Sequence, residues 1–183
     1  MKRVNWGIIG LGNMANHHLK SFEKSKNCQL RGIASKNSQK LKNFRKKINI
    51  QDIFCSNNYE DLIKNSEIDI IYITLPNSHH YEWINKCIDH GKHVLVEKPI
   101  TENLFQLEKI KSKLLQKKTS ILIYEGFMYK YFPQIKKVLD LVHNNEIGEI
   151  KKIVSNFGVN LLTKNYFYFF KKKKKIDKES RLF

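Results

Sequence analysis

The chain has 183 residues, of which 41% are hydrophobic, and a formal net charge of +17 at pH 7. This length suits one ordinary domain with a further segment, and no apolar run approaches the roughly 20 residues of a membrane span. The charge admits a nucleic-acid partner, but lysines occur in almost every segment, and no basic stripe with interleaved aromatic residues precedes residue 166. Composition therefore favours a globular protein without a membrane partner and leaves nucleic-acid binding as a minority hypothesis.

The first element along the chain is an apolar run over residues 4–9, which predicts a buried strand. It ends in the sequence GLGNMA over residues 10–15, and helical spacing continues to Phe22. Gly10 permits a tight turn, Gly12 lets the backbone approach a pyrophosphate, and Ala15 lets the helix pack closely on the strand. Because the G-x-G-x-x-A pattern stands between a strand and a helix, it predicts a dinucleotide site rather than an ordinary turn.

The second predicted strand, residues 29–35, bears on the choice between NAD and NADP. At its end, an acidic residue bonds the ribose 2′-hydroxyl of NAD, whereas a small polar residue beside a cation accommodates the 2′-phosphate of NADP. This chain has Ser35 and Lys36 there, and no Asp or Glu occurs between residues 27 and 51. The pattern favours NADP, although Lys36 could be one more solvated lysine of a lysine-rich chain.

Strand and helix patterns then alternate, which predicts an α/β fold with a doubly wound parallel sheet of the Rossmann type. The predicted strands are residues 53–55, 69–74, 93–96 and 121–124, and the predicted helices are residues 41–48, 59–64, 78–90 and 103–117. Three widely spaced cysteines show no metal-ligand spacing, which predicts reduced thiols in a cytoplasmic protein. From Glu125 onward an aromatic cluster precedes a helix over residues 133–144 and a strand over residues 150–157, so a domain boundary is expected near residue 125.

Several stretches of the chain resemble the N-terminal part of the Gfo/Idh/MocA oxidoreductases, a family that includes inositol dehydrogenase and dihydrodiol dehydrogenase. They are GIIGLGNMA, IYITLPNSHH, GKHVLVEKP, EGFMYKYFPQI and IGEI, which follow the family's order over roughly residues 3 to 157. GKHVLVEKP is the most diagnostic, and EGFMYKYFPQ is most similar to the dihydrodiol-dehydrogenase-like branch. The resemblance implies hydride transfer between NADP or NAD and a secondary alcohol of a sugar or cyclic polyol-like substrate.

The resemblance also implies roles for individual residues, and Lys98 is the implied catalytic residue. A lysine beside the nicotinamide is suited to hold the substrate oxygen and to help move its proton. Asn77 could instead cap the following helix, His79 and His80 cannot both face a ligand, and Glu125 could line the same cleft or form a salt bridge. The implied cofactor-binding residues are Gly10, Gly12 and Asn13 at the pyrophosphate, Ser35 and Lys36 at the adenosine ribose, and Thr74, Pro76, Asn77, His80 and Glu97 toward the nicotinamide.

The chain departs from the family pattern in its last segment. Family members continue into a mostly antiparallel sheet with a glycine-rich segment followed by Asp and His, and nothing here matches that segment. After residue 157 come aromatic residues at 166–170, lysines at 171–175 and the sequence SRLF at 180–183. The resemblance thus implies a Rossmann domain over residues 1–125 and the incomplete start of an α+β substrate domain over residues 126–183.

Two alternatives to an active enzyme follow from this departure. The first is a catalytically silent nucleotide-binding fragment, since the expected acid/base histidine and the substrate sheet are not found. The second is a basic interaction protein that uses the aromatic and lysine-rich residues 166–175. A homo-oligomer could form through the C-terminal sheet where that sheet is complete.

Overall fold

The computed structural model describes residues 3–118 and 120–156. The chain divides into two compact units, Met1–Phe132 and Pro133–Phe183. In its described part, the first unit holds a six-stranded parallel sheet in the order β3-β2-β1-β4-β5-β6, which confirms the predicted doubly wound Rossmann arrangement. The strands are β1 (Val4–Ile9), β2 (Cys28–Ala34), β3 (Phe54–Ser56), β4 (Ile70–Ile73), β5 (His93–Val96) and β6 (Ile123–Glu125).

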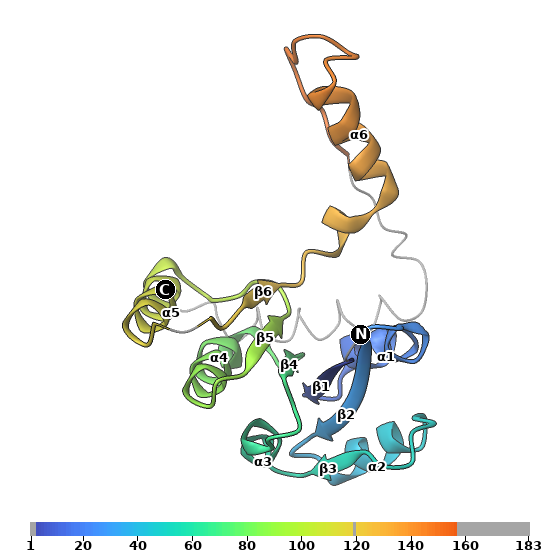
Figure 1. Cartoon of the computed structure of the whole chain (residues 1–183), viewed down its shortest axis with the longest axis vertical. Helices are drawn as coiled ribbons and strands as arrows, with labels where there is room; N and C mark the ends of the chain where they lie inside the picture. Colours follow the sequence, from blue (N-terminus) through green and yellow to red (C-terminus); the bar gives the residue numbers. More distant parts are fainter. Residues whose placement is uncertain (1–2, 119, 157–183) are drawn as a thin grey trace, which may run out of the picture. The chain divides into compact units, whose positions relative to one another are not determined.

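Helices cover both faces of this sheet, so its central strands are apolar on both sides. Figure 1 shows α1 and α2 on one face and α3, α4 and α5 on the other. Ile8 on β1 belongs to the core layer under α1 and α2, while the next residue, Ile9, belongs to the opposite layer, and both are fully buried. The helices are α1 (Asn13–Lys24), α2 (Ser38–Arg45), α3 (Tyr59–Lys64), α4 (His80–Asp89) and α5 (Leu104–Gln116), with the short 3-10 helices η1 (Asn77–His79) and η2 (Met128–Tyr131).

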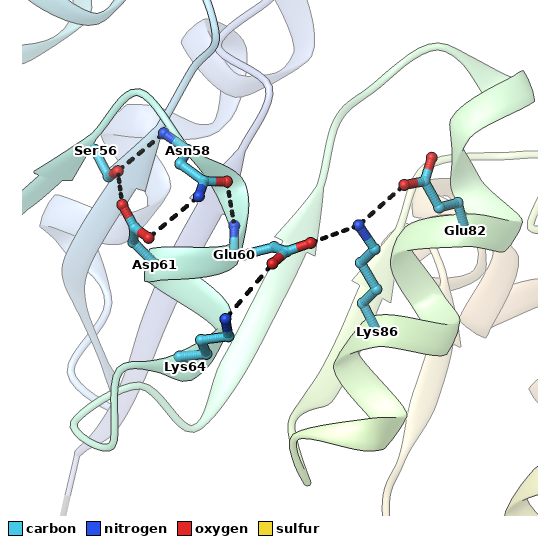
Figure 2. Close-up of polar contacts among 7 residues, drawn as sticks. All are labelled: Ser56, Asn58, Glu60, Asp61, Lys64, Glu82 and Lys86. Carbon is cyan, nitrogen blue, oxygen red and sulfur yellow. Dashed lines mark hydrogen bonds and ion pairs between the residues drawn. The ribbon is translucent and has the colours of Figure 1, made fainter.

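Polar side chains at the surface connect α3 with α4 (Figure 2). The Asn58 side chain caps α3 by accepting a bond of 3.1 Å from the backbone of Glu60. The carboxylate of Glu60 accepts a bond of 2.7 Å from Lys86 on α4, whose ammonium also lies 3.1 Å from Glu82. The hydrogen bond from Lys86 lowers the pKa of Glu60. These pairs face solvent, so their contribution to stability is modest.

Lys92, in the diagnostic GKH stretch, has a structural role in the first unit. Its side chain is largely buried, and its ammonium donates bonds of 2.7 Å to the carbonyls of Asn65 and Ile68. These carbonyls follow α3 and precede β4, so the lysine fixes the entry of the chain into a central strand. Burial lowers the pKa of this ammonium, and the two carbonyls offset part of its lost hydration.

In the second unit, the helix predicted from Pro133 is present as α6 (Pro133–His143). The strand predicted over residues 150–157 is wrong for residues 150–156, which have no strand conformation. Alternating apolar residues form a strand only beside a neighbour that completes the backbone hydrogen bonds, and no described strand pairs with this segment. Residue 157, the aromatic residues 166–170, the lysines 171–175 and residues 180–183 lie outside the described residues. None of the helices in the described part has both the length and the apolar character needed to cross a membrane.

Candidate functional site

The predicted site residues gather at one edge of the sheet because its strands are parallel and their carboxyl ends coincide. Between β1 and β4 the connections change direction, and ligands of open α/β sheets bind in the crevice outside such a switch point. Along this edge the residues that end or follow the strands come in the spatial order Ser35, Gly10, Thr74, Glu97 and Glu125. The sheet therefore arranges the residues predicted for the adenosine, pyrophosphate and nicotinamide parts of a dinucleotide in that same order.

Gly10 is required by the fold as well as by the predicted chemistry. Its φ is +85°, a left-handed conformation that side chains disfavour. A Cβ atom there would lie 2.7 Å from Cδ2 of Leu75 and 3.0 Å from the carbonyl oxygen of Thr74. The Thr74 hydroxyl donates a hydrogen bond to the Gly10 carbonyl. Thr74 therefore fixes the glycine turn across the switch point from within the protein.

Gly12, in contrast, faces open space at the beginning of α1. A Cβ atom at this position would have no neighbour within 4 Å, and the helix has no side-chain cap. Asn13 is exposed beside it, and the Asn16 side chain donates a bond of 2.7 Å to the Gly12 carbonyl. Uncapped N–H groups and the positive end of the helix dipole suit an anion. The beginning of α1 thus fits a pyrophosphate that approaches the backbone over Gly12.

At the expected ribose end, the two predicted residues differ in accessibility. Ser35 is only 3% exposed, and its hydroxyl accepts a bond of 3.3 Å from the backbone of Asn37, the residue that caps α2. Lys36 is exposed, and its ammonium lies 5.7 Å from the centre of the Tyr59 ring. The cation at the end of β2 is therefore placed by an aromatic ring and remains open to a phosphate, whereas Ser35 shapes the turn.

The residues after β4 also divide into exposed and buried groups. Pro76 and Asn77 are exposed where η1 begins. Neither η1 nor α4 has a side-chain cap bond in the structure, so the capping role considered for Asn77 is not found among the described residues. His80 is fully buried, with Nδ1 2.7 Å from the carbonyl oxygen of Pro99 and Nε2 2.9 Å from that of Leu75. The structure thus places His80 inside the protein, behind the residues that face solvent.

The stretch after β5 is held by contacts on both sides of Lys98. The Tyr72 hydroxyl donates to Oε1 of Glu97, and the backbone N–H of Ile100 donates a bond of 2.8 Å to Oε1 of Glu125. Lys98 itself is exposed at the end of the strand. Its ammonium is therefore available to a ligand at a position that the neighbouring residues define.

Sequence reasoning did not identify Tyr72 and His18 as neighbours of the site. Burial, followed by the bond to Glu97, raises the pKa of the Tyr72 hydroxyl well above its usual range. The ring centre of His18 lies 5.9 Å from that of Tyr72. Burial lowers the pKa of His18, the neighbouring His17 lowers it further, and the charge of Glu97 raises it. Tyr72 lies within the uninterrupted apolar run of β4. Such a run predicts that the tyrosine ring is buried, but it does not indicate what the hydroxyl group of that ring contacts.

A groove of about 970 Å³ adjoins the Glu97 end of this edge. It lies over the sheet beside α1, and its lining includes Trp6, Phe22 and Tyr72 together with Glu97 and Glu125. The glycine turn and Lys98 do not line it. The groove is thus distinct from the strand-end crevice of the predicted pyrophosphate site, and the two regions share the carboxylates at the ends of β5 and β6.

This sheet, with an uncapped helix and a glycine turn at its switch point, defines a dinucleotide-binding domain of the Rossmann type. Residues 4–125 match the family described as "Oxidoreductase family, NAD-binding Rossmann fold". The chain belongs to this family, the Gfo/Idh/MocA oxidoreductases, as its sequence predicted.

Curated relatives of this chain include two enzymes that act on cyclic diols or sugars. Trans-1,2-dihydrobenzene-1,2-diol dehydrogenase of Xenopus tropicalis is 29% identical over 160 residues, which cover 86% of this chain and 47% of the relative. dTDP-3,4-didehydro-2,6-dideoxy-alpha-D-glucose 3-reductase of Actinomadura kijaniata is 29% identical over 157 residues, covering 85% and 46%. The chain thus spans about half the length of the curated relatives it matches.

Solved structures show the same fold with either cofactor bound. A scyllo-inositol dehydrogenase from Lactobacillus casei with NAD(H) and scyllo-inositol has a TM-score of 0.74 and 25% identity, covering 81% of this chain and 43% of that one. A 3-ketoreductase from Actinomadura kijaniata with NADP and TDP-benzene has a TM-score of 0.72 and 29% identity, covering 82% and 45%. The described fold is therefore that of the cofactor-binding half of these enzymes.

Proposed function

We propose that this chain is the cofactor-binding part of an NAD(P)-dependent oxidoreductase. The reaction is hydride transfer between a nicotinamide and a secondary alcohol of a sugar or cyclic polyol-like substrate. The observation that carries the proposal is the open, uncapped beginning of α1 at Gly12, with Lys98 exposed at the end of β5 on the same edge of the sheet. Diol, inositol and sugar-nucleotide substrates in the names of the relatives support this substrate class.

Each part of the edge has its own task in this proposal. Gly12 and Asn13 bind the pyrophosphate through backbone N–H groups, and Lys36 pairs with the 2′-phosphate of NADP, the favoured cofactor. Asn77 lies toward the nicotinamide, which accepts or donates the hydride when it is bound. Lys98 holds the substrate oxygen as charge develops on it and helps to move its proton.

Lys98 is suited to this work by its surroundings. Glu97 accepts the hydrogen bond of Tyr72, and among the described residues Lys98 forms no ion pair. Pro99 follows directly, and its carbonyl is held by the His80 ring. The backbone on either side of Lys98 is thereby fixed while the ammonium stays exposed, which is the arrangement that orienting a substrate oxygen requires.

A second candidate function is cofactor binding without catalysis. The observation that favours it is the coverage of 46% and 47% of the two curated relatives, which leaves the substrate domain of such enzymes unmatched. For either function we propose a cytoplasmic location, because Cys28, Cys55 and Cys87 are all free thiols.

The test compares the 183-residue chain with a version extended through the sheet of the family's second domain. Both should bind NADPH in fluorescence titrations, and only the extended version should oxidise members of a panel of inositols, sugars and cyclic diols. In that version Lys98→Ala should lower kcat about 100-fold with KM for NADP nearly unchanged. Lys111→Ala, which removes an exposed lysine of α5, is the matched control. NADPH binding without turnover by the extended version would favour the second candidate, and no NADPH binding by either would refute both.

A further inference from the structure

Among the described residues, the buried ring of His80 contacts two hydrogen-bond acceptors and no donor. Both ring nitrogens lie within hydrogen-bond distance of backbone carbonyl oxygens, at 2.7 Å from Pro99 and 2.9 Å from Leu75. A carbonyl oxygen only accepts, so each contact is a hydrogen bond only when the facing nitrogen carries a proton. A neutral imidazole has one N–H, whereas the imidazolium has two. Both bonds are therefore satisfied only by the protonated ring.

The two carbonyls belong to different strand-end segments. Leu75 follows β4 and immediately precedes Pro76 and Asn77, whereas Pro99 immediately follows Lys98 at the end of β5. His80 is the first residue of α4, so a rigid helix carries the ring that joins both segments. One side chain thus connects the position of Asn77 with that of Lys98.

A carboxylate on the neighbouring strand compensates the charge of such a ring. The peptide group between Pro99 and Ile100 accepts from His80 through its carbonyl and donates through its N–H to Glu125, at 2.8 Å. A cation at the oxygen and an anion at the N–H polarise this peptide in the same sense, and each strengthens the bond of the other. A buried charge is tolerated where its bonds are satisfied and an opposite charge is near.

We propose that His80 is a positioning residue whose protonated ring, with Glu125 across the Pro99–Ile100 peptide, holds the Asn77 and Lys98 segments in their relative places. The proposal rests on the proposed function where it says what those segments bind. Loss of a proton from the ring would set a nitrogen lone pair against a carbonyl lone pair, and one segment would have to move. The ionisable groups of the surrounding elements include Tyr72 on β4, His79 on η1, Tyr81 and Glu82 on α4, Glu97 and Lys98 after β5, Glu102 before α5 and Glu125 on β6.

The first test measures the ring directly in the full 183-residue chain without cofactor. Long-range 1H–15N spectra, assigned with His80→Gln, report the protonation of each ring nitrogen, and amide spectra report Asn77 and Ile100 between pH 5.5 and 9. We expect two protonated ring nitrogens, and any loss of one to coincide with shifts of both backbone amides. A ring that loses its proton while these amides keep their shifts would overturn the proposal. A ring with only one protonated nitrogen throughout this range would also overturn it, and if the variant does not fold, through-bond correlation of the ring with the backbone of His80 assigns it in the wild-type chain.

The second test asks whether the connection matters for the cofactor. His80→Gln replaces the two ring nitrogens with one amide nitrogen and one amide oxygen, so only one of the two former nitrogen positions can donate, and we expect NADPH affinity to fall about tenfold. His79→Gln is the matched control, because that neighbouring ring is exposed. Its one described ionic contact is with Glu82, at 4.0 Å. A folded His80→Gln chain with wild-type NADPH affinity would refute the positioning role. A wild-type chain that binds no NADPH would refute the proposed function, while the ring spectra would still decide the state of His80.

Discussion

Gly12→Val separates the cofactor role of the glycine turn from its structural role. Gly12 has φ −89° and ψ −161°, an extended conformation that valine readily adopts, and a Cβ atom there meets nothing within 4 Å. Replacing glycine at a compatible position restricts the unfolded chain and stabilises by about 0.4–1 kcal/mol. Valine is a poorer N-cap than glycine by a similar amount. The two effects nearly cancel, so the free energy of unfolding should stay within about 1 kcal/mol of the wild-type value.

The same substitution should abolish tight cofactor binding. The valine methyl groups would occupy the open space over the backbone, where the pyrophosphate must approach the uncapped N–H groups of α1. A hydrogen bond to a charged group contributes about 1.5–3 kcal/mol, so loss of two such bonds amounts to at least about 3 kcal/mol. That loss corresponds to a decrease in NADPH affinity of more than about 100-fold.

Fluorescence titration with NADPH measures the affinity, and urea unfolding followed by circular dichroism measures stability. Gly10→Ala is the contrasting variant, because its φ of +85° and its contact with Leu75 should cost about 1–3 kcal/mol of stability. A folded Gly12→Val chain that binds NADPH as tightly as the wild type would refute the placement of the cofactor at this turn.

Three further predictions concern specificity, thiol chemistry and acid stability. Ser35→Asp should lower NADPH affinity relative to NADH by about tenfold or more through charge repulsion, and tighter binding of NADH than NADPH by the unmodified chain would contradict the NADP preference. Burial raises the pKa of Cys87 to about 12, so in the folded chain at pH 8 a disulfide reagent should label Cys55 before Cys87, as peptide mass spectrometry would show. Lys86 lowers the pKa of Glu60, so the pair stabilises the fold above the unfolded-state pKa of about 4.3 and less as the pH falls. The loss of stability that Lys86→Met causes at pH 7 should therefore shrink by pH 3 in urea titrations, and an equal loss at both pH values would exclude this linkage.

Most of the sheet could be predicted because its signals are local. The helix over residues 59–64 and the strand over residues 93–96 have the predicted bounds, since an acidic first turn and a continuous apolar run mark them. The helix predicted from Leu41 begins earlier, at Ser38, because Asn37 caps it and the polar first turn carries no apolar pattern. The strand predicted over residues 150–157 is wrong for residues 150–156 for the opposite reason. Its alternation was present, but a strand also needs a partner, which no local pattern specifies.

The candidate site was predictable in position but not in contacts. The turns predicted after the strands over residues 4–9 and 93–96 place Gly12 and Lys98 at one edge of the sheet, because parallel strands bring their carboxyl ends together. The sequence could not decide which of the adjacent residues His79 and His80 faces inward. That choice depends on where the carbonyl of Pro99 lies, and only the packing of β5 against α4 determines it. Side-chain contacts between distant segments are therefore the part of the site that needed the structure.

The pairing of β1 with β4 has a consequence for the order of assembly. This pairing joins segments 64 residues apart, whereas β1 and β2 belong to neighbouring stretches of the chain. Contacts between distant segments require the larger loss of chain entropy and tend to limit the folding rate. The bond between Thr74 and Gly10 closes the glycine turn across this same seam, so the turn is complete only after the two halves of the sheet have met. We therefore expect cofactor binding to appear with the last step of folding, and a bound dinucleotide to slow unfolding most strongly at the β1–β4 seam.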